Sequence, residues 1–198
     1  MTKVSPMAPF KSRVQSFIFH CIAPVACSIV IGYLFYGAHV FNRYSPGFQF
    51  LWSATVATVF YYLLLYVRPR DAYLGLALMF GLTFLTTGST RTAFIVRDIL
   101  YFAAIGSSVV LYVRYFLRGA HVSLGYPAVV LAGLYSLTYV VLSELHFGIL
   151  LSSGLESTGG SFMSVALSGA FFGTLIGCAL GIGITLSEKL FGPVPKSG

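Results

Sequence analysis

The chain has 198 residues, of which 57% are hydrophobic and only 9% are charged. Because soluble domains contain about 25% charged residues, this composition excludes a water-soluble globular protein and predicts that lipid covers much of the surface. The net charge of +7 comes from 12 Lys and Arg residues that are spread over many short segments. They form no continuous basic stripe, so we expect membrane lipids, and not nucleic acid, as a partner.

A basic stretch, residues 1–15, precedes the first long apolar segment, residues 16–38. This segment is longer than the apolar core of a signal peptide, which has about 7–15 residues. His39 and Val40 follow it without a convincing pattern of small residues for cleavage. We therefore expect an uncleaved first transmembrane helix, with residues 1–15 as a cytoplasmic tail.

Five further apolar segments follow, and they cover residues 48–67, 72–87, 93–117, 124–151 and 161–186. The segment at residues 72–87 is short for a hydrocarbon core of about 30 Å, so its ends are expected to rely on flanking polar residues. None shows the alternating polarity of transmembrane strands. The sequence thus predicts an all-α, polytopic integral membrane protein, in which a bundle of six transmembrane helices occupies residues 16–190.

The basic residues predict how this bundle is oriented. With six spans, both termini lie on one side, together with the loops after the second and fourth segments. That side carries nine basic residues, namely Lys3, Lys11, Arg13, Arg68, Arg70, Arg114, Arg118, Lys189 and Lys196, whereas the other side carries only Arg43, Arg91 and Arg97. The positive-inside rule therefore predicts cytoplasmic termini, including a cytoplasmic C-terminal tail at residues 191–198, in a bacterial inner membrane or an organelle membrane.

The most specific pattern is a glycine repeat in the last segment. Gly169, Gly173, Gly177 and Gly181 recur every four residues and therefore share one helix face. Four glycines make a groove about 18 Å long, into which a neighbouring backbone can fit closely. This glycine-zipper pattern predicts a helix-packing face. Packing within the bundle, contact with another subunit, and the lining of a pore or ligand groove all remain open.

A second feature is a gathering of polar residues at the predicted external end. Arg91, Arg97 and Asp98 lie at the start of the fourth segment, and Glu144 and His146 lie near the end of the fifth. Ionisable groups at the edge of hydrocarbon are costly unless they are paired or wetted. We consider three roles for this outer cluster: a structural ion pair between Glu144 and Arg91 or Arg97, a ligand-binding site, and catalysis.

Motifs for chemistry are lacking in the sequence, so we assign no catalytic residue, metal ligand or cofactor. It contains no HExxH, CxxC, GxSxG or P-loop pattern. Of the four histidines, only His39 and His146 are expected at a similar membrane depth, as a pair of haem ligands would require. An intramembrane enzyme that uses the outer cluster is one of the possible interpretations, but it is the weakest of them.

Three functions from different classes are compatible with these features. The first is a non-catalytic subunit or scaffold of a larger membrane complex, which contacts other membrane chains or a second copy of itself through the glycine face. The second is a small-molecule binding or transport protein, with its site in the outer cluster at Arg97, Glu144 and His146. The third is the intramembrane enzyme. We rank the complex subunit slightly above the binding protein.

Overall fold

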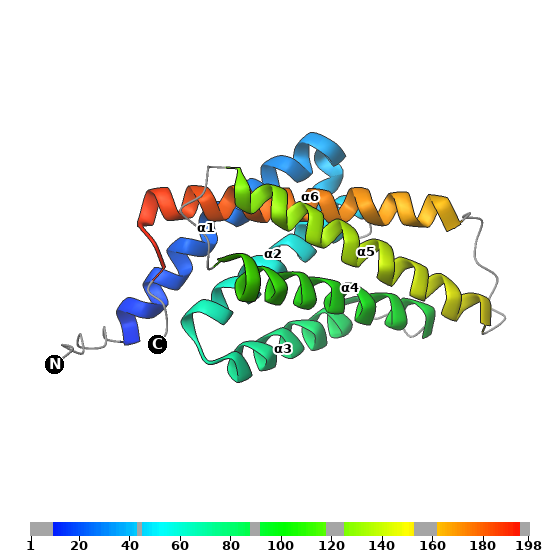
Figure 1. Ribbon diagram of the computed structural model, residues 1–198, viewed down its shortest axis with the longest axis horizontal. Helices are drawn as coiled ribbons and strands as arrows, with labels where there is room; N and C mark the ends of the chain where they lie inside the picture. The colour runs from blue at the N-terminus through cyan, green and yellow to red at the C-terminus, as the bar shows by residue number, and fades with distance from the viewer. Residues whose placement is uncertain (1–9, 43–44, 88–91, 118–124, 153–161, 195–198) are drawn as a thin grey trace.

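The computed structural model describes residues 10–42, 45–87, 92–117, 125–152 and 162–194, and its regular structure within these ranges is entirely helical (Figure 1). Its six α-helices are α1 (Phe10–Tyr36), α2 (Pro46–Tyr66), α3 (Pro69–Thr87), α4 (Thr92–Leu111), α5 (Tyr126–Ser152) and α6 (Phe162–Phe191). A 3₁₀-helix, η1 (Gly37–Phe41), follows α1, and a π-helical turn, η2 (Tyr112–Phe116), follows α4. The prediction of an all-α chain is confirmed for these residues.

Local sequence signals explain several helix boundaries. The Ser45 hydroxyl caps the start of α2 by accepting a hydrogen bond of 3.2 Å from the backbone N–H of Phe48, and Pro46 occupies the first turn. Gly37 follows α1 with φ of +56°, and Gly192 follows α6 with φ of +82°. Both glycines adopt the left-handed conformation that commonly ends a helix, which other residues rarely adopt.

Each predicted apolar segment coincides with one helix, but the outer boundaries differ. The first helix begins at Phe10, and thus includes the last residues of the predicted 1–15 tail. The last helix continues to Phe191, beyond the predicted boundary at residue 186. The difference arises because an apolar run marks the part of a helix that needs lipid, whereas helical backbone continues through flanking polar residues such as Glu188 and Lys189.

Four helical stretches are long and apolar enough to cross a membrane, namely Val14–Phe41, Pro46–Tyr66, Ile99–Phe116 and Ala166–Phe191. Within the described residues, α5 contributes a shorter apolar helix, Tyr126–Leu142, and α3 is not among the four. These lengths and compositions are typical of a membrane protein. Six spans with cytoplasmic termini remain a prediction.

Successive helices run in alternating directions, so the first turns of α1 and the last turns of α6 lie at the same end of the bundle (Figure 1). The helix α6 packs most extensively against α5 and also contacts α1 and α2, whereas α2 contacts α1, α3, α4 and α6. By contrast, α3 lies at the edge and contacts α2 and α4. We call the end that holds the start of α1 and the end of α6 the terminal end.

Candidate functional site

The predicted outer cluster lies largely outside the described part of the chain. Arg91 lies outside the described residues. The backbones of Arg97 and Asp98 belong to α4 and that of His146 to α5, but the side chains of these three residues are not described. Only Glu144 is described, as an exposed side chain on α5. Whether these residues come together therefore stays a prediction.

The glycine repeat of α6 faces the backbone of α5. Gly169, Gly173, Gly177 and Gly181 are all buried. A Cβ atom at any of the last three would lie closer than 3.0 Å to α5 backbone atoms, which belong to Tyr135 and Ser136, to Leu131 and Ala132, and to Pro127 and Ala128. Each glycine one turn further along α6 thus meets α5 residues that lie one turn earlier in the chain.

Other contacts hold the opposite side of α6. A Cβ atom at Gly183 would overlap the backbone of Pro24 on α1. The helix α6 therefore lies between two neighbours of its own chain, and the backbones approach so closely that a single methyl group does not fit. Because α5 covers Gly173, Gly177 and Gly181, a partner subunit reaches these glycines only by displacing α5.

A buried polar network at the terminal end joins three segments around His20. The ring is 2% exposed. Its Nδ1 lies 2.7 Å from the backbone oxygen of Ser16, and its Nε2 lies 3.1 Å from the backbone oxygen of Gly192, which is 172 residues away in the chain. The Tyr66 hydroxyl on α2 is 3.1 Å from Nδ1 and 2.7 Å from the Ser16 hydroxyl. We call these four residues the His20 network.

The chemistry of the two carbonyl partners limits how the His20 ring satisfies its hydrogen bonds. A backbone carbonyl only accepts, so each contact requires a proton on the ring nitrogen. The neutral ring donates to one carbonyl, whereas the doubly protonated ring donates to both. The Glu188 carboxylate on α6 interacts electrostatically with His20. The ring centroids of Tyr62 and Phe191 lie 5.7 and 5.9 Å from the centroid of the His20 ring.

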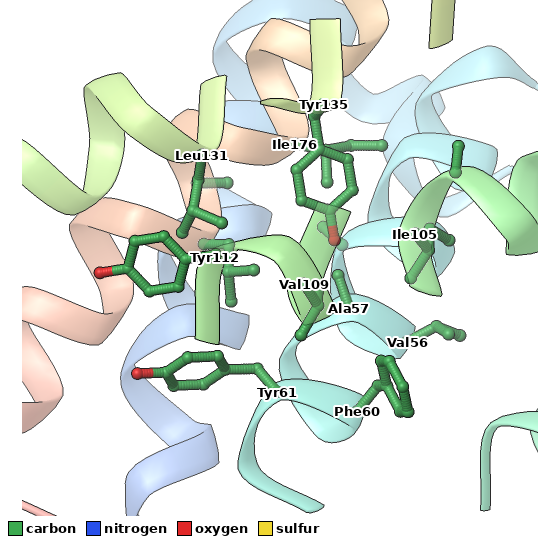
Figure 2. Close-up of a cluster of buried hydrophobic side chains, with 14 of the residues drawn as sticks. Val56, Ala57, Phe60, Tyr61, Ile105, Val109, Tyr112, Leu131, Tyr135 and Ile176 are labelled. Carbon is green, nitrogen blue, oxygen red and sulfur yellow. The ribbon is translucent and has the colours of Figure 1, made fainter. Parts of the chain in front are cut away.

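The centre of the bundle contains tyrosines whose hydroxyls make no hydrogen bond of normal geometry in the described part of the chain, although those of Tyr62 and Tyr139 lie near the Ser187 and Ser53 hydroxyls. These are Tyr61 and Tyr62 on α2 and Tyr135 and Tyr139 on α5, and all four are at most 1% exposed. We call them the core tyrosines. In Figure 2 the Tyr135 hydroxyl points between α4 and α2, towards Val109 and Ala57. The hydroxyls of Tyr61 and Tyr112 point together in another direction (Figure 2).

Ring contacts arrange these aromatic side chains in two groups. The centroid of the Tyr61 ring is 4.9 Å from that of Tyr62 and 6.1 Å from that of Tyr112. On the other side, Tyr139 lies 6.3 Å from Tyr135 and 5.3 Å from Tyr101. The group with Tyr62 continues to His20, because the Tyr62 and His20 rings are neighbours. Polar aromatic groups therefore extend from the terminal end into the middle of the bundle.

The absence of partners for the core tyrosines has a physical cost. A buried hydroxyl that makes no hydrogen bond costs about 1–3 kcal/mol, and such groups are rare in folded proteins. The buried set in the described residues contains no Asp, Glu, Lys or Arg. What lies at the centre is thus a group of neutral donors and acceptors with aromatic walls.

Sequence analysis missed both the His20 network and the core tyrosines. His20 looks like an ordinary residue near a helix end, because its partner Gly192 lies at the far end of the chain. The tyrosines do leave a signal. Tyr135 and Tyr139 lie one turn apart in the middle of an apolar segment, not at a boundary where tyrosine usually lies.

Comparisons with known proteins add no relatives: no protein-family model, curated protein or solved structure matches this chain. Within the described residues, no three His, Cys, Asp or Glu side chains lie together where they would hold a metal ion.

Proposed function

We propose that this chain is an integral membrane protein of the binding or transport class, and that it binds a small uncharged molecule among the core tyrosines. The observation that supports this proposal is the set of buried tyrosine hydroxyls, of which those of Tyr61 and Tyr135 have no hydrogen-bond partner among the described residues. A bound molecule with carbonyl or hydroxyl groups supplies the missing hydrogen bonds, and this offsets the cost of burying the hydroxyls.

The surroundings narrow the class of ligand. The buried described residues carry no Asp, Glu, Lys or Arg, so a charged ligand finds no counter-charge there. Aromatic rings surround the hydroxyls, and flat apolar molecules stack favourably on such rings. We therefore infer a small, flat, neutral molecule with at least one hydrogen-bonding oxygen or nitrogen. This places the proposed site in the bundle interior, in place of the outer cluster expected from the sequence.

The two other interpretations remain predictions. The complex-subunit interpretation was based on the glycine face, and α5 covers Gly173, Gly177 and Gly181 of that face within this chain. The enzyme interpretation requires the outer cluster, of which only the Glu144 side chain belongs to the described residues. Neither has a supporting contact in the described part of the chain.

The proposal is tested by identifying small molecules that stay bound when the protein is extracted gently from its own membrane. Native mass spectrometry of the wild type is expected to show one discrete small mass per chain. The variants Tyr61→Phe and Tyr135→Phe are expected to lose it by about five- to tenfold, since each removes one hydrogen bond. Tyr33→Phe is the matched control, because Tyr33 is exposed on α1.

A stability measurement separates loss of binding from loss of folding. In ligand-free protein, replacing a buried unpartnered Tyr by Phe removes a polar group that costs free energy to bury. The free energy of unfolding of these variants should therefore be equal to or higher than that of the wild type. Binding and stability are thus expected to change in opposite directions. If wild-type protein instead carries stoichiometric partner chains and no small molecule, the complex-subunit interpretation replaces this proposal.

A further inference from the structure

An open pocket with a volume of about 590 Å³ lies where α2 ends and α3 begins, and Arg68, Arg70, Asp71, Tyr73 and Leu74 line it. Both arginines are exposed. Neither guanidinium forms an ion pair or a side-chain hydrogen bond to another described residue. The turn between α2 and α3, which carries these residues, is at the terminal end of the bundle (Figure 1). Two free guanidinium groups beside one cavity suit an anionic ligand.

An apolar stripe leads away from this pocket along α3. Leu74, Leu78 and Leu82 are 61%, 62% and 56% exposed, although they are large and apolar. Spaced by four residues, they share one helix face that is about 12 Å long. The helix packs inward through the buried Ala72, and beside the stripe at Gly75, where a Cβ atom would meet the Leu63 side chain. Leu74 belongs to both the pocket and the stripe.

We propose that this pocket and stripe bind one anionic phospholipid. Its phosphodiester lies between Arg68 and Arg70, and one acyl chain lies along Leu74, Leu78 and Leu82. Arginine suits this role because its planar guanidinium donates two parallel hydrogen bonds to phosphate oxygens. Tyr73, which is 49% exposed, provides the ring that tyrosine commonly places at the membrane boundary.

The charge of the pocket selects among headgroups. Arg68 and Arg70 contribute two positive charges and Asp71 one negative charge, so the net charge is +1. A phosphodiester with a single negative charge and a neutral headgroup balances it. A zwitterionic choline headgroup adds a positive charge beside the arginines and loses this balance, and its bulky quaternary ammonium donates no hydrogen bond to Asp71. We therefore expect the pocket to favour phosphatidylglycerol over phosphatidylcholine.

Lipid retention in native mass spectrometry tests this proposal. The full chain is reconstituted in nanodiscs that contain equal amounts of phosphatidylglycerol and phosphatidylcholine, and the lipids that stay bound on release are identified. One phosphatidylglycerol is expected to stay on the wild type. Each of Arg68→Gln and Arg70→Gln is expected to lower its retention about fivefold, because one basic side chain near a membrane contributes about that factor in affinity.

Arg114→Gln is the matched control, because Arg114 is another exposed arginine at the terminal end but does not line the pocket. Retention in this variant should equal that of the wild type. The proposal is overturned if the two lipids are retained equally by the wild type. It is also overturned if Arg114→Gln lowers retention as much as Arg68→Gln does, which would indicate general attraction to basic residues. Neither result bears on the core tyrosines, since the two sites share no residue.

Discussion

At the residue scale, His20 shows how one side chain joins segments that are distant in sequence. Its ring contacts a carbonyl of its own helix, a carbonyl beyond the end of α6, and a hydroxyl on α2. Apolar packing alone allows neighbouring helices to slide, whereas these directional contacts allow only one alignment. We therefore assign His20 a role in fixing where α1, α2 and the end of α6 meet.

Replacing His20 by Phe keeps a ring of similar size but removes both ring nitrogens. The free energy of unfolding is expected to fall by about 1–3 kcal/mol, because the buried ring loses its hydrogen bonds to the Ser16 and Gly192 carbonyls and to Tyr66. Thermal or SDS-induced unfolding in bicelles measures this change. His39→Phe is the control, since His39 is exposed on η1, and it should change stability little. Equal stabilities of His20→Phe and wild type would contradict the assigned role.

At the element scale, α6 makes the most extensive helix–helix contact of the bundle, with α5. The four-residue glycine spacing predicts a packing face from sequence, because that spacing and the missing side chains are local properties. It could not identify α5 as the neighbour. The α5 residues opposite the glycines, Ala128, Ala132 and Ser136, are small and also recur every four residues. Similar pairs of small residues occur in other apolar segments of this chain, so the pattern does not single out α5.

Two alanine substitutions should therefore have opposite effects on stability. In Gly177→Ala the new methyl group overlaps the α5 backbone at Ala132, so the helices must separate, at a cost of about 1–3 kcal/mol or more. In Gly133→Ala, on α5, nothing lies within 4 Å of the new methyl group. Here the gain in helix propensity should stabilise the protein by up to about 1 kcal/mol. Similar unfolding midpoints for the two variants would rule out the close α5–α6 contact.

At the scale of the whole molecule, the six apolar runs predicted the helices because each run is a local signal. The interior could not be predicted in the same way. Tyrosine is usual at membrane boundaries, and only the packing of α2, α4 and α5 shows that Tyr61 and Tyr135 lie inside, with unpartnered hydroxyls. The outer cluster stands out in the sequence, and whether its residues come together stays a prediction.

The alternating directions of the helices have a direct consequence for a membrane-spanning chain. The end of α6 and the turn between α2 and α3 lie at the terminal end (Figure 1). Phe41, at the end of η1, is 21 residues beyond His20. The α-helical part of this stretch, from His20 to Tyr36, is about 24 Å long at 1.5 Å per residue, and η1 follows it at the far end of α1.

Labelling of single cysteines in intact membrane vesicles of known orientation tests this account most directly. In a background without Cys21, Cys27 and Cys178, the exposed sites are introduced one at a time as Leu190→Cys, Arg70→Cys and Phe41→Cys, and each is treated with a membrane-impermeant maleimide. We expect Leu190→Cys and Arg70→Cys to react from the cytoplasmic face and Phe41→Cys to react only from the opposite face. Reaction of all three from one face would contradict a six-span bundle that crosses the membrane.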